Sequence, residues 1–439
     1  MVDQYVQAGE NPPASLGSSS HTDVYAKIAW RLVPLLIFIF ILAWLDRVNI
    51  GFAKLQMLQD LKFSDAVYGL GAGIFFIGYF LFEIPSNLLM HRIGARKTMM
   101  RITVCWGVVS TLMMFVKTPM SFYALRFLLG VCEAGFFPGV ILYLTYWFPS
   151  KRRAKVNALF MTSFALAGAV GGPIAGTIMS MMGNVGGMAS WQWLFLLEGI
   201  PSILAGLFLV RMLPDRPANA AWLNEHEKAS VTGELEAEKK LIVAHSSLLS
   251  VMKNPHLWLC AAIFFCLVGG NAIISFWVPS VIKELGEQNV LLIGILSSVP
   301  FALGAVAMVL NGSHSDRTGE RRLHCAGFSL LAVFGLAMTG VMLASAKIAF
   351  LMLVVAGIGV LGAMPVFWSF PASFLKDEAA AGGIGVINAV ANLSGFFAPV
   401  AMGYLRTTTG SVASGLYLAA GLECIAALLI LTFVKRTPK

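Results

Sequence analysis

Twelve long apolar runs constrain what this 439-residue chain can fold into. An α-helix rises about 1.5 Å per residue, so about 20 residues cross the hydrocarbon core of a bilayer. Each run is of that length or close to it. The sequence therefore predicts an all-α membrane protein with twelve transmembrane helices. The runs are 28–52, 66–90, 99–116, 120–147, 156–181, 191–213, 256–282, 290–311, 325–345, 347–371, 381–405 and 414–434.

Composition supports this interpretation. Charged residues make up 12% of the chain, against about 25% in soluble domains, and the mean hydropathy is +0.78. The net charge of +9 does not indicate nucleic-acid binding, because the basic residues gather in short segments between alternate runs. The positive-inside rule then places these segments and both termini in the cytoplasm of a bacterial cell, with the chain in the cytoplasmic (inner) membrane. The segments hold Arg92, Arg96 and Lys97; Lys151, Arg152, Arg153 and Lys155; Arg317, Arg321 and Arg322; Lys435 and Arg436.

Several classes of function find no support in the sequence. The six cysteines stand singly, so neither a disulfide framework nor a metal site is indicated. There is no GxxxxGK[ST] motif for ATP, and no nucleophile–base pair or metal cluster for an enzyme. We therefore expect no cofactor other than protons as a coupling ion.

The chain divides into two similar halves. The segment His91–Lys97 after the second run is echoed, 225 residues later, by Asp316–Arg322 after the eighth. We expect a disordered cytoplasmic tail at 1–27, a six-helix bundle at 28–213, a cytoplasmic linker at 214–255, a second six-helix bundle at 256–434 and a short tail at 435–439. Paired six-helix bundles related by pseudo-symmetry, with a site at their interface, are typical of secondary transporters.

Charged residues inside the apolar runs are the candidate site. Asp46 and Arg47 lie in the first run, and each charge costs roughly 2.5–3.5 kcal/mol at the centre of a membrane helix. Arg126 and Glu133 share one face of the fourth helix, two turns apart. Asp46 and Arg126 each lie about six residues from the outer end of their runs, which predicts similar depths. A single cluster of two acids and two bases is expected, and Asn271 stands where the repeat would place a second Asp46.

Such a cluster has two interpretations. It is either a static salt-bridge network or a site for coupled transport. A buried carboxylate stays ionised beside an arginine and takes up a proton when it loses that partner. A substrate anion that competes for the arginine would therefore promote protonation of the acid, which is symport chemistry.

Other candidate residues are neutral or lie further from this cluster. Tyr79 and Glu83 are one turn apart on the second helix; we expect Tyr79 to contact either substrate or a neighbouring helix, and Glu83 to act as a gate or cap. Trp368 is a candidate substrate contact or part of an interfacial aromatic belt. Asn388 is a further neutral candidate. The acids Glu198 and Glu423, without evident partners, are interpreted as structural or interfacial and are left outside the site.

The loops resemble those of the major facilitator superfamily, whose motif reads G-x-x-x-D-R-x-G-R-[KR]. The second copy keeps Gly312, Asp316, Arg317, Gly319 and Arg321. The first copy departs from the motif, with Asn87 in place of the glycine and His91 in place of the aspartate.

Five further segments resemble the anion:cation symporter family, which includes permeases for tartrate, sugar acids, hydroxyphenylacetate and phthalate. They are Leu45–Phe52, Gly78–Asn87, the stretch Arg126, Glu133 and Pro138, Trp191–Gly199, and Leu213–Pro217.

The resemblance implies roles for the candidate residues. Asp46 and Glu133 would carry protons, and Arg47, Arg126, Tyr79, Trp368 and Asn388 would bind substrate. Ala165 stands near the position of a hydroxyl-binding glutamine of sugar-acid members.

We therefore expect a secondary transporter that imports an organic carboxylate by proton symport with alternating access. The substrate would be a sugar acid, a tartrate-like dicarboxylate or an aromatic acid, and the loss of the glutamine makes the last two competitive with the first. The alternatives are a proton-linked antiporter that exports a drug or metabolite, and a carboxylate sensor that does not transport.

Overall fold

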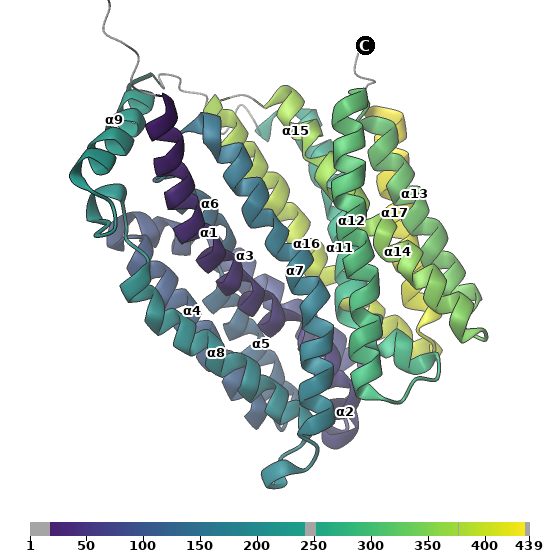
Figure 1. Cartoon of the computed structure of the whole chain (residues 1–439). Helices are drawn as coiled ribbons and strands as arrows, with labels where there is room; N and C mark the ends of the chain where they lie inside the picture. The colour runs from purple at the N-terminus through teal and green to yellow at the C-terminus, as the bar shows by residue number, and fades with distance from the viewer. Residues whose placement is uncertain (1–17, 242–251, 376, 435–439) are drawn as a thin grey trace, which may run out of the picture.

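The computed structural model of the protein describes residues 18–241, 252–375 and 377–434. Twelve helical spans in these ranges are long and apolar enough to cross a membrane, which confirms the predicted all-α membrane fold. Figure 1 shows them side by side. The helices of the first half are α1 (Ser18–Val48), α2 (Ile50–Leu61), α3 (Asp65–Ile93), α4 (Ala95–Leu112), α5 (Pro119–Glu133), α6 (Phe136–Thr145), α7 (Ser150–Met181) and α8 (Ser190–Met212). After α9 (Glu225–Leu241) come α11 (Pro255–Glu284), α12 (Val290–Thr318), α13 (Arg322–Val341), α14 (Ala346–Phe367), α15 (Ser369–Phe374), α16 (Asp377–Thr409) and α17 (Ala413–Phe433).

Three of the twelve spans are interrupted, and each interruption adjoins a candidate site residue. The first span breaks between α1 and α2, just after Arg47, and the fourth breaks between α5 and α6, just after Glu133. The tenth breaks between α14 and α15 at Trp368. Broken helices at membrane depth free backbone groups that must be satisfied inside the protein, so they occur where protein, not lipid, surrounds them.

Helix α9 lies at the end of the bundle where α1 begins and α17 ends, and we call this end the α9 face (Figure 1). Its acids pair with the first half: Lys27 with Glu227 at 2.9 Å, and Arg153 with Glu238 at 3.2 Å. The Lys27 hydrogen bond holds the pKa of Glu227 below its usual value. Helix α1 begins at Ser18, ten residues before the expected start at 28, and Tyr25 and Lys27 in this added stretch bond to Glu234 and Glu227 of α9. The residues before it, and 435–439, lie outside the described ranges.

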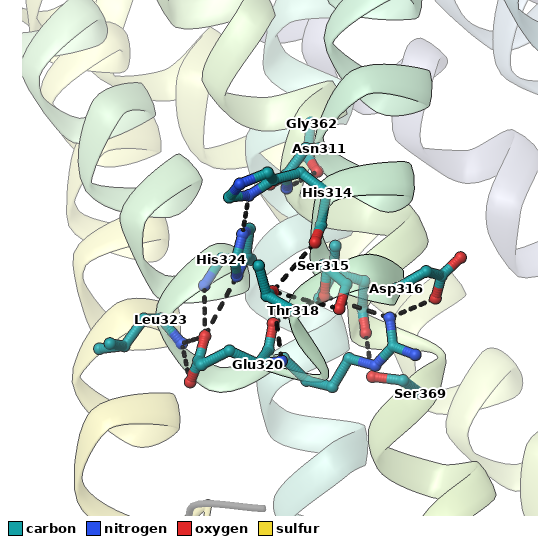
Figure 2. Close-up of polar contacts among 12 residues, drawn as sticks. Asn311, His314, Ser315, Asp316, Thr318, Glu320, Leu323, His324, Gly362 and Ser369 are labelled. Carbon is teal, nitrogen blue, oxygen red and sulfur yellow. Dashed lines mark hydrogen bonds and ion pairs between the residues drawn. The ribbon is translucent and has the colours of Figure 1, made fainter. Parts of the chain in front are cut away.

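The two loop motifs are stabilised differently. In the second half, Asp316 pairs with Arg321. Glu320 accepts a hydrogen bond from the backbone N–H of Leu323 at 2.8 Å, where α13 begins; Figure 2 shows Glu320 beside Leu323. In the first half, where the motif's aspartate is missing, Asp215 from the linker accepts the backbone N–H of Arg96 at 2.8 Å. An acid from elsewhere in the chain therefore caps this loop.

The two halves are joined by polar contacts at the end opposite the α9 face, which we call the opposite face. Asp65 on α3 pairs with Lys54 on α2 at 2.7 Å and with Arg406 on α16 at 3.3 Å. Arg406 also pairs with Glu284 on α11 at 3.1 Å. The Lys54 ammonium lies 3.1 Å from the ring centroid of Trp277, a cation–π contact across the halves. Asp65 is thus the acid shared by cations from both halves.

Close backbone approach completes this contact. Gly172 on α7 and Gly294 on α12 lie so near one another that a Cβ on either would collide with the other's carbonyl oxygen. Gly69 on α3 faces the carbonyl of Pro399 on α16 in the same way. Small residues at such crossings let membrane helices pack backbone to backbone. The structure is therefore closed between the halves on the side of the opposite face.

We expect Asp65→Asn to weaken this closure, because it leaves Lys54 and Arg406 without their shared carboxylate. A loss of about 1–3 kcal/mol would shift the population roughly 5- to 150-fold toward a conformation open at the opposite face. The measurement is the labelling rate of Ser275→Cys, in a background without the six native cysteines, by an impermeant maleimide. Asp60→Asn is the matched control, since Asp60 bonds Trp191 inside its own half at 2.8 Å. Equal rates for both variants would contradict the role of Asp65.

Candidate substrate and proton site

An ion pair between half-buried Arg47 and buried Glu133 joins the ends of α1 and α5. Glu133, the last residue of α5, is 1% exposed, and its Oε2 accepts hydrogen bonds from Arg47 Nε at 3.1 Å and Nη2 at 2.6 Å. Its other oxygen, Oε1, has no hydrogen-bond partner among the described residues. Only one of the two carboxylate oxygens is therefore used, which leaves the second free to bind a proton or a ligand donor.

Two aromatic rings of α3 support the Arg47 guanidinium. Its Cζ lies 5.0 Å from the ring centroid of Phe75 and 5.4 Å from that of Tyr79. These rings are one helical turn apart and therefore share one face of α3. Cation–π contacts of this kind stabilise a guanidinium while leaving its N–H groups available to an anion. Tyr79, a candidate from the sequence, thus lies beside the ion pair.

Arg126 lies on the same face of α5 as Glu133 but does not pair with it. Its Nε donates to the carbonyl of Gly71 at 3.1 Å, Nη2 reaches the carbonyl of Ala72 at 3.5 Å, and Nη1 has no partner among the described residues. The side chain is fully buried, with Cζ 5.1 Å from the Phe75 centroid. Phe75 therefore contacts both guanidinium groups. Sequence reasoning missed this residue; its only signal was its spacing of four from Tyr79.

Asp46 faces away from this ion pair. Its carboxylate accepts hydrogen bonds from Ser110 Oγ at 2.5 Å and Trp106 Nε1 at 3.2 Å on α4, and from Ser202 Oγ at 2.6 Å on α8. Consecutive helical residues point about 100° apart, so Asp46 and Arg47 cannot face the same neighbours. The hydrogen bonds therefore divide the expected single cluster of two acids and two bases into two groups, one on each side of α1, with Glu133 still close enough to act on the charge of Asp46.

The depth argument for Asp46 and Arg126 is also corrected. The first span does not end at Phe52 but continues through α2 to Leu61, so the polar residues after Phe52 still belong to the helix. Fourteen residues separate Arg47 from Leu61, and fourteen separate Pro119 from Glu133. Arg47 and Glu133 are thus at matching depths, and Arg126 lies two turns nearer the opposite face.

The remaining candidates are spread more widely. Glu83 is half-buried on α3, one turn beyond Tyr79 toward the α9 face. Trp368 packs edge to face on Phe264 at 4.8 Å, inside the second half. Asn388 is half-buried on α16. No hydrogen bond among the described residues joins Trp368 or Asn388 to the Arg47–Glu133 pair.

An aromatic cluster lies beside the ion pair on α1. Trp44 precedes Arg47 by three residues and so shares its face of the helix. The Phe40 ring lies 6.4 Å from that of Trp44 and 4.5 Å from that of Phe164 on α7, next to Ala165. Trp44 also lines a small cleft between α1, α2, α7, α11 and α12. The neighbourhood of Arg47 on this side is therefore apolar and ring-lined.

Two helical halves packed against each other, with broken membrane-spanning helices beside charged residues, are typical of a secondary transporter. The comparisons with known proteins agree. Residues 36–399 match the model of the Major Facilitator Superfamily, and the chain belongs to that superfamily.

Individual relatives extend the comparison. A protein of Agrobacterium vitis named "Putative tartrate transporter" is 45% identical over 95% of this chain and 92% of its own length. A quinolone resistance transporter of Acinetobacter baumannii is 38% identical over 90% of this chain and 91% of its own. The crystal structure of a D-xylose–proton symporter superposes with a TM-score of 0.73 at 16% identity, over 92% of this chain and 98% of that one. The relatives are consistent with an anion transporter family, and the chain is a multi-pass membrane protein and not an enzyme.

The turn that places Glu133 gives a test of this geometry. Gly135, between α5 and α6, has φ +85°, and a Cβ there would lie 2.7 Å from Ser86. Gly187 has φ +74° with nothing near it. Both glycines resist substitution through backbone strain, but only Gly135 also meets a steric barrier. We expect Gly135→Ala to cost about 1–3 kcal/mol more stability than Gly187→Ala, measured by thermal unfolding in detergent. Equal losses would show that the contact with Ser86 is not tight.

Proposed function

We propose that the protein imports an organic carboxylate together with protons, by alternating access, in a bacterial inner membrane with both termini in the cytoplasm. The observation that carries the proposal is the buried Arg47–Glu133 pair, in which one carboxylate oxygen is unused. This arrangement supports a site in which a substrate anion binds Arg47 and a proton binds Glu133 when the ion pair separates.

The coupling follows from the cost of buried charge. In the observed pair, Arg47 and Glu133 neutralise each other. A substrate carboxylate that takes over the guanidinium leaves Glu133 buried without a cation, which is unfavourable by several kcal/mol unless the acid is protonated. Substrate and proton therefore bind together, and their release restores the ion pair. Tyr79 and Arg126 would complete the anion site, Trp368 and Asn388 would approach from the second half when the halves close, and Glu83 would gate the α9 side.

The energetics depend on the number of protons. If Asp46 and Glu133 each carry one proton with a monoanion, one net positive charge enters the cell. The membrane potential then contributes about 2.3 kcal/mol per 100 mV, or roughly fifty-fold in accumulation. A one-to-one ratio would gain nothing from the potential.

Two features support the substrate class. The relative of Agrobacterium vitis, whose name refers to tartrate, suggests a short dicarboxylate. The rings of Phe40, Trp44 and Phe164 beside Arg47 suit a flat, aromatic acid and offer few partners to a polyhydroxylated chain. A thermal-shift panel of sugar acids, tartrate isomers and aromatic acids on purified protein discriminates among them, because ligands raise the melting temperature.

The second candidate is proton-linked export, which the quinolone resistance relative favours. The direction of flux separates the two. An inward proton gradient drives accumulation inside vesicles for a symporter and extrusion for an antiporter.

Glu133→Gln should abolish proton-driven accumulation of tartrate while exchange of tartrate across the membrane persists. Glutamine keeps the size of the side chain and mimics the protonated acid, but it cannot release a proton. The measurement compares gradient-driven uptake with counterflow in proteoliposomes. Gradient-driven uptake at the wild-type level in this variant would remove Glu133 from the coupling mechanism.

Arg126→Lys should weaken tartrate binding by about 1.5–3 kcal/mol, roughly 10- to 150-fold in Kd. A guanidinium can donate to the Gly71 carbonyl through Nε and bind a carboxylate through its other N–H groups, whereas the compact ammonium of lysine cannot do both in that geometry. The Kd is measured by calorimetry. Arg101→Lys is the matched control, since Arg101 makes one hydrogen bond from α4 to Ser86 on α3. Similar losses in both variants would mean that Arg126 acts through general packing.

A further inference from the structure

A second buried acid, Glu198, lies near Asp46. Glu198 on α8 is 4% exposed and lies one turn before Ser202, whose hydroxyl bonds Asp46. Asn49 follows Asp46 by one turn. Its side-chain amide is a polar neighbour of the Glu198 carboxyl group. The pairs Glu198/Ser202 and Asp46/Asn49 therefore face each other across the interface between α8 and the junction of α1 and α2.

No arginine, lysine or histidine among the described residues forms an ion pair with Asp46 or Glu198. Asp46 receives three hydrogen-bond donors, whereas neither carboxyl oxygen of Glu198 has a hydrogen-bond partner in the part of the chain that the structure describes. Two like charges in a medium of low dielectric repel strongly, and each also loses its hydration. The two carboxyl groups therefore hold at least one proton between them.

The repeat provides an internal comparison. The offset of 225 residues that relates the two loop motifs carries Glu198 onto Glu423 and Asp46 onto Asn271. Glu423 is fully buried on α17, against Gly270 on α11, and also has no hydrogen-bond partner among the described residues. The buried glutamate thus occurs in both halves, but only the first half adds an aspartate opposite it. The acid pair is confined to the half that carries Arg47 and Glu133.

We propose that Glu198 and Asp46 form a carboxyl pair that takes up and releases protons together, so that Glu198 is a third proton-binding residue. The proposal rests on the proposed symport and deepens it. One proton bound by the pair leaves one negative charge, which the donors on Asp46 stabilise, and a second proton makes the pair neutral. A conformation that admits water to the pair releases both protons, so the pair exchanges two protons in a transport cycle and Asp46 alone would exchange one. The pair lies on the side of α1 away from Arg47, so its protons do not compete with substrate for space.

The first experiment measures protonation without transport. Purified full-length protein in nanodiscs is taken through a pH step, and infrared difference spectroscopy records the carboxylic acid C=O band. We expect Glu198→Gln to remove a component of the wild-type difference band, and Glu423→Gln to leave that band unchanged because Glu423 has no acidic partner and stays protonated. Loss of the same component in both variants, or in neither, would overturn the proposal.

The second experiment measures the proton to tartrate ratio in proteoliposomes from the reversal of flux. The ratio should fall by one in Glu198→Gln, which lowers accumulation about tenfold for each unit of pH gradient, and should not change in Glu423→Gln. If Glu198→Gln does not fold, Glu198→Asp serves instead: the acid is kept, so the C=O band must shift in frequency, and an unshifted band overturns the proposal. If wild-type protein moves no tartrate at all, the proposed function fails for that acid while the infrared result still decides the role of Glu198.

Discussion

The ion pair between Arg47 and Glu133 is the interaction on which the rest of the site depends. Each charge alone would be costly in a dry interior, and the pair is tolerable because each group supplies what the other lost from water. That balance can be kept in a second way, with an anion on the guanidinium and a proton on the acid. Binding of the anion alone leaves Glu133 without a cation, and protonation of Glu133 alone leaves Arg47 without an anion. Both half-occupied states are therefore unfavourable. Coupling between substrate and proton is thus a property of the desolvated pair.

The broken spans give this pair its position. Arg47 lies at the end of α1 and Glu133 at the end of α5, so both charged groups sit where the helical hydrogen-bond ladder is interrupted. Gly135 permits the turn after Glu133 through its positive φ, and its missing side chain lets α3 approach at Ser86. Contacts at the opposite face, centred on Asp65, hold the halves together beyond the pair. The Arg47–Glu133 pair therefore has the aromatic rings of α3 beside it and the ion pairs of Asp65 closing the halves at the opposite face.

The sequence was sufficient for the twelve spans, because their apolar length is a property of local composition, and for placing Arg47 close to Glu133. It was insufficient for the end of the first span. Lys54 looks like the start of a loop, yet it stays in the helix because Asp65 and Trp277, distant in the chain, neutralise and cover it. Phe75 was missed for the same reason: its contacts with Arg47 and Arg126 come from tertiary neighbours that no local pattern records.

The adjacency of Asp46 and Arg47 has a consequence for how transport could be coupled. Because successive residues on a helix diverge by about 100°, one turn of α1 must serve two surroundings: Arg47 and Glu133 on one side, Asp46 with α4 and α8 on the other. A rigid helix cannot displace one of these side chains without displacing the other. Any shift of α1 that accompanies substrate binding at Arg47 would therefore alter the hydrogen bonds of Asp46, and with them the protons that the acid pair can hold. Linkage between the two groups then requires no contact between them, only the stiffness of the helix that carries both.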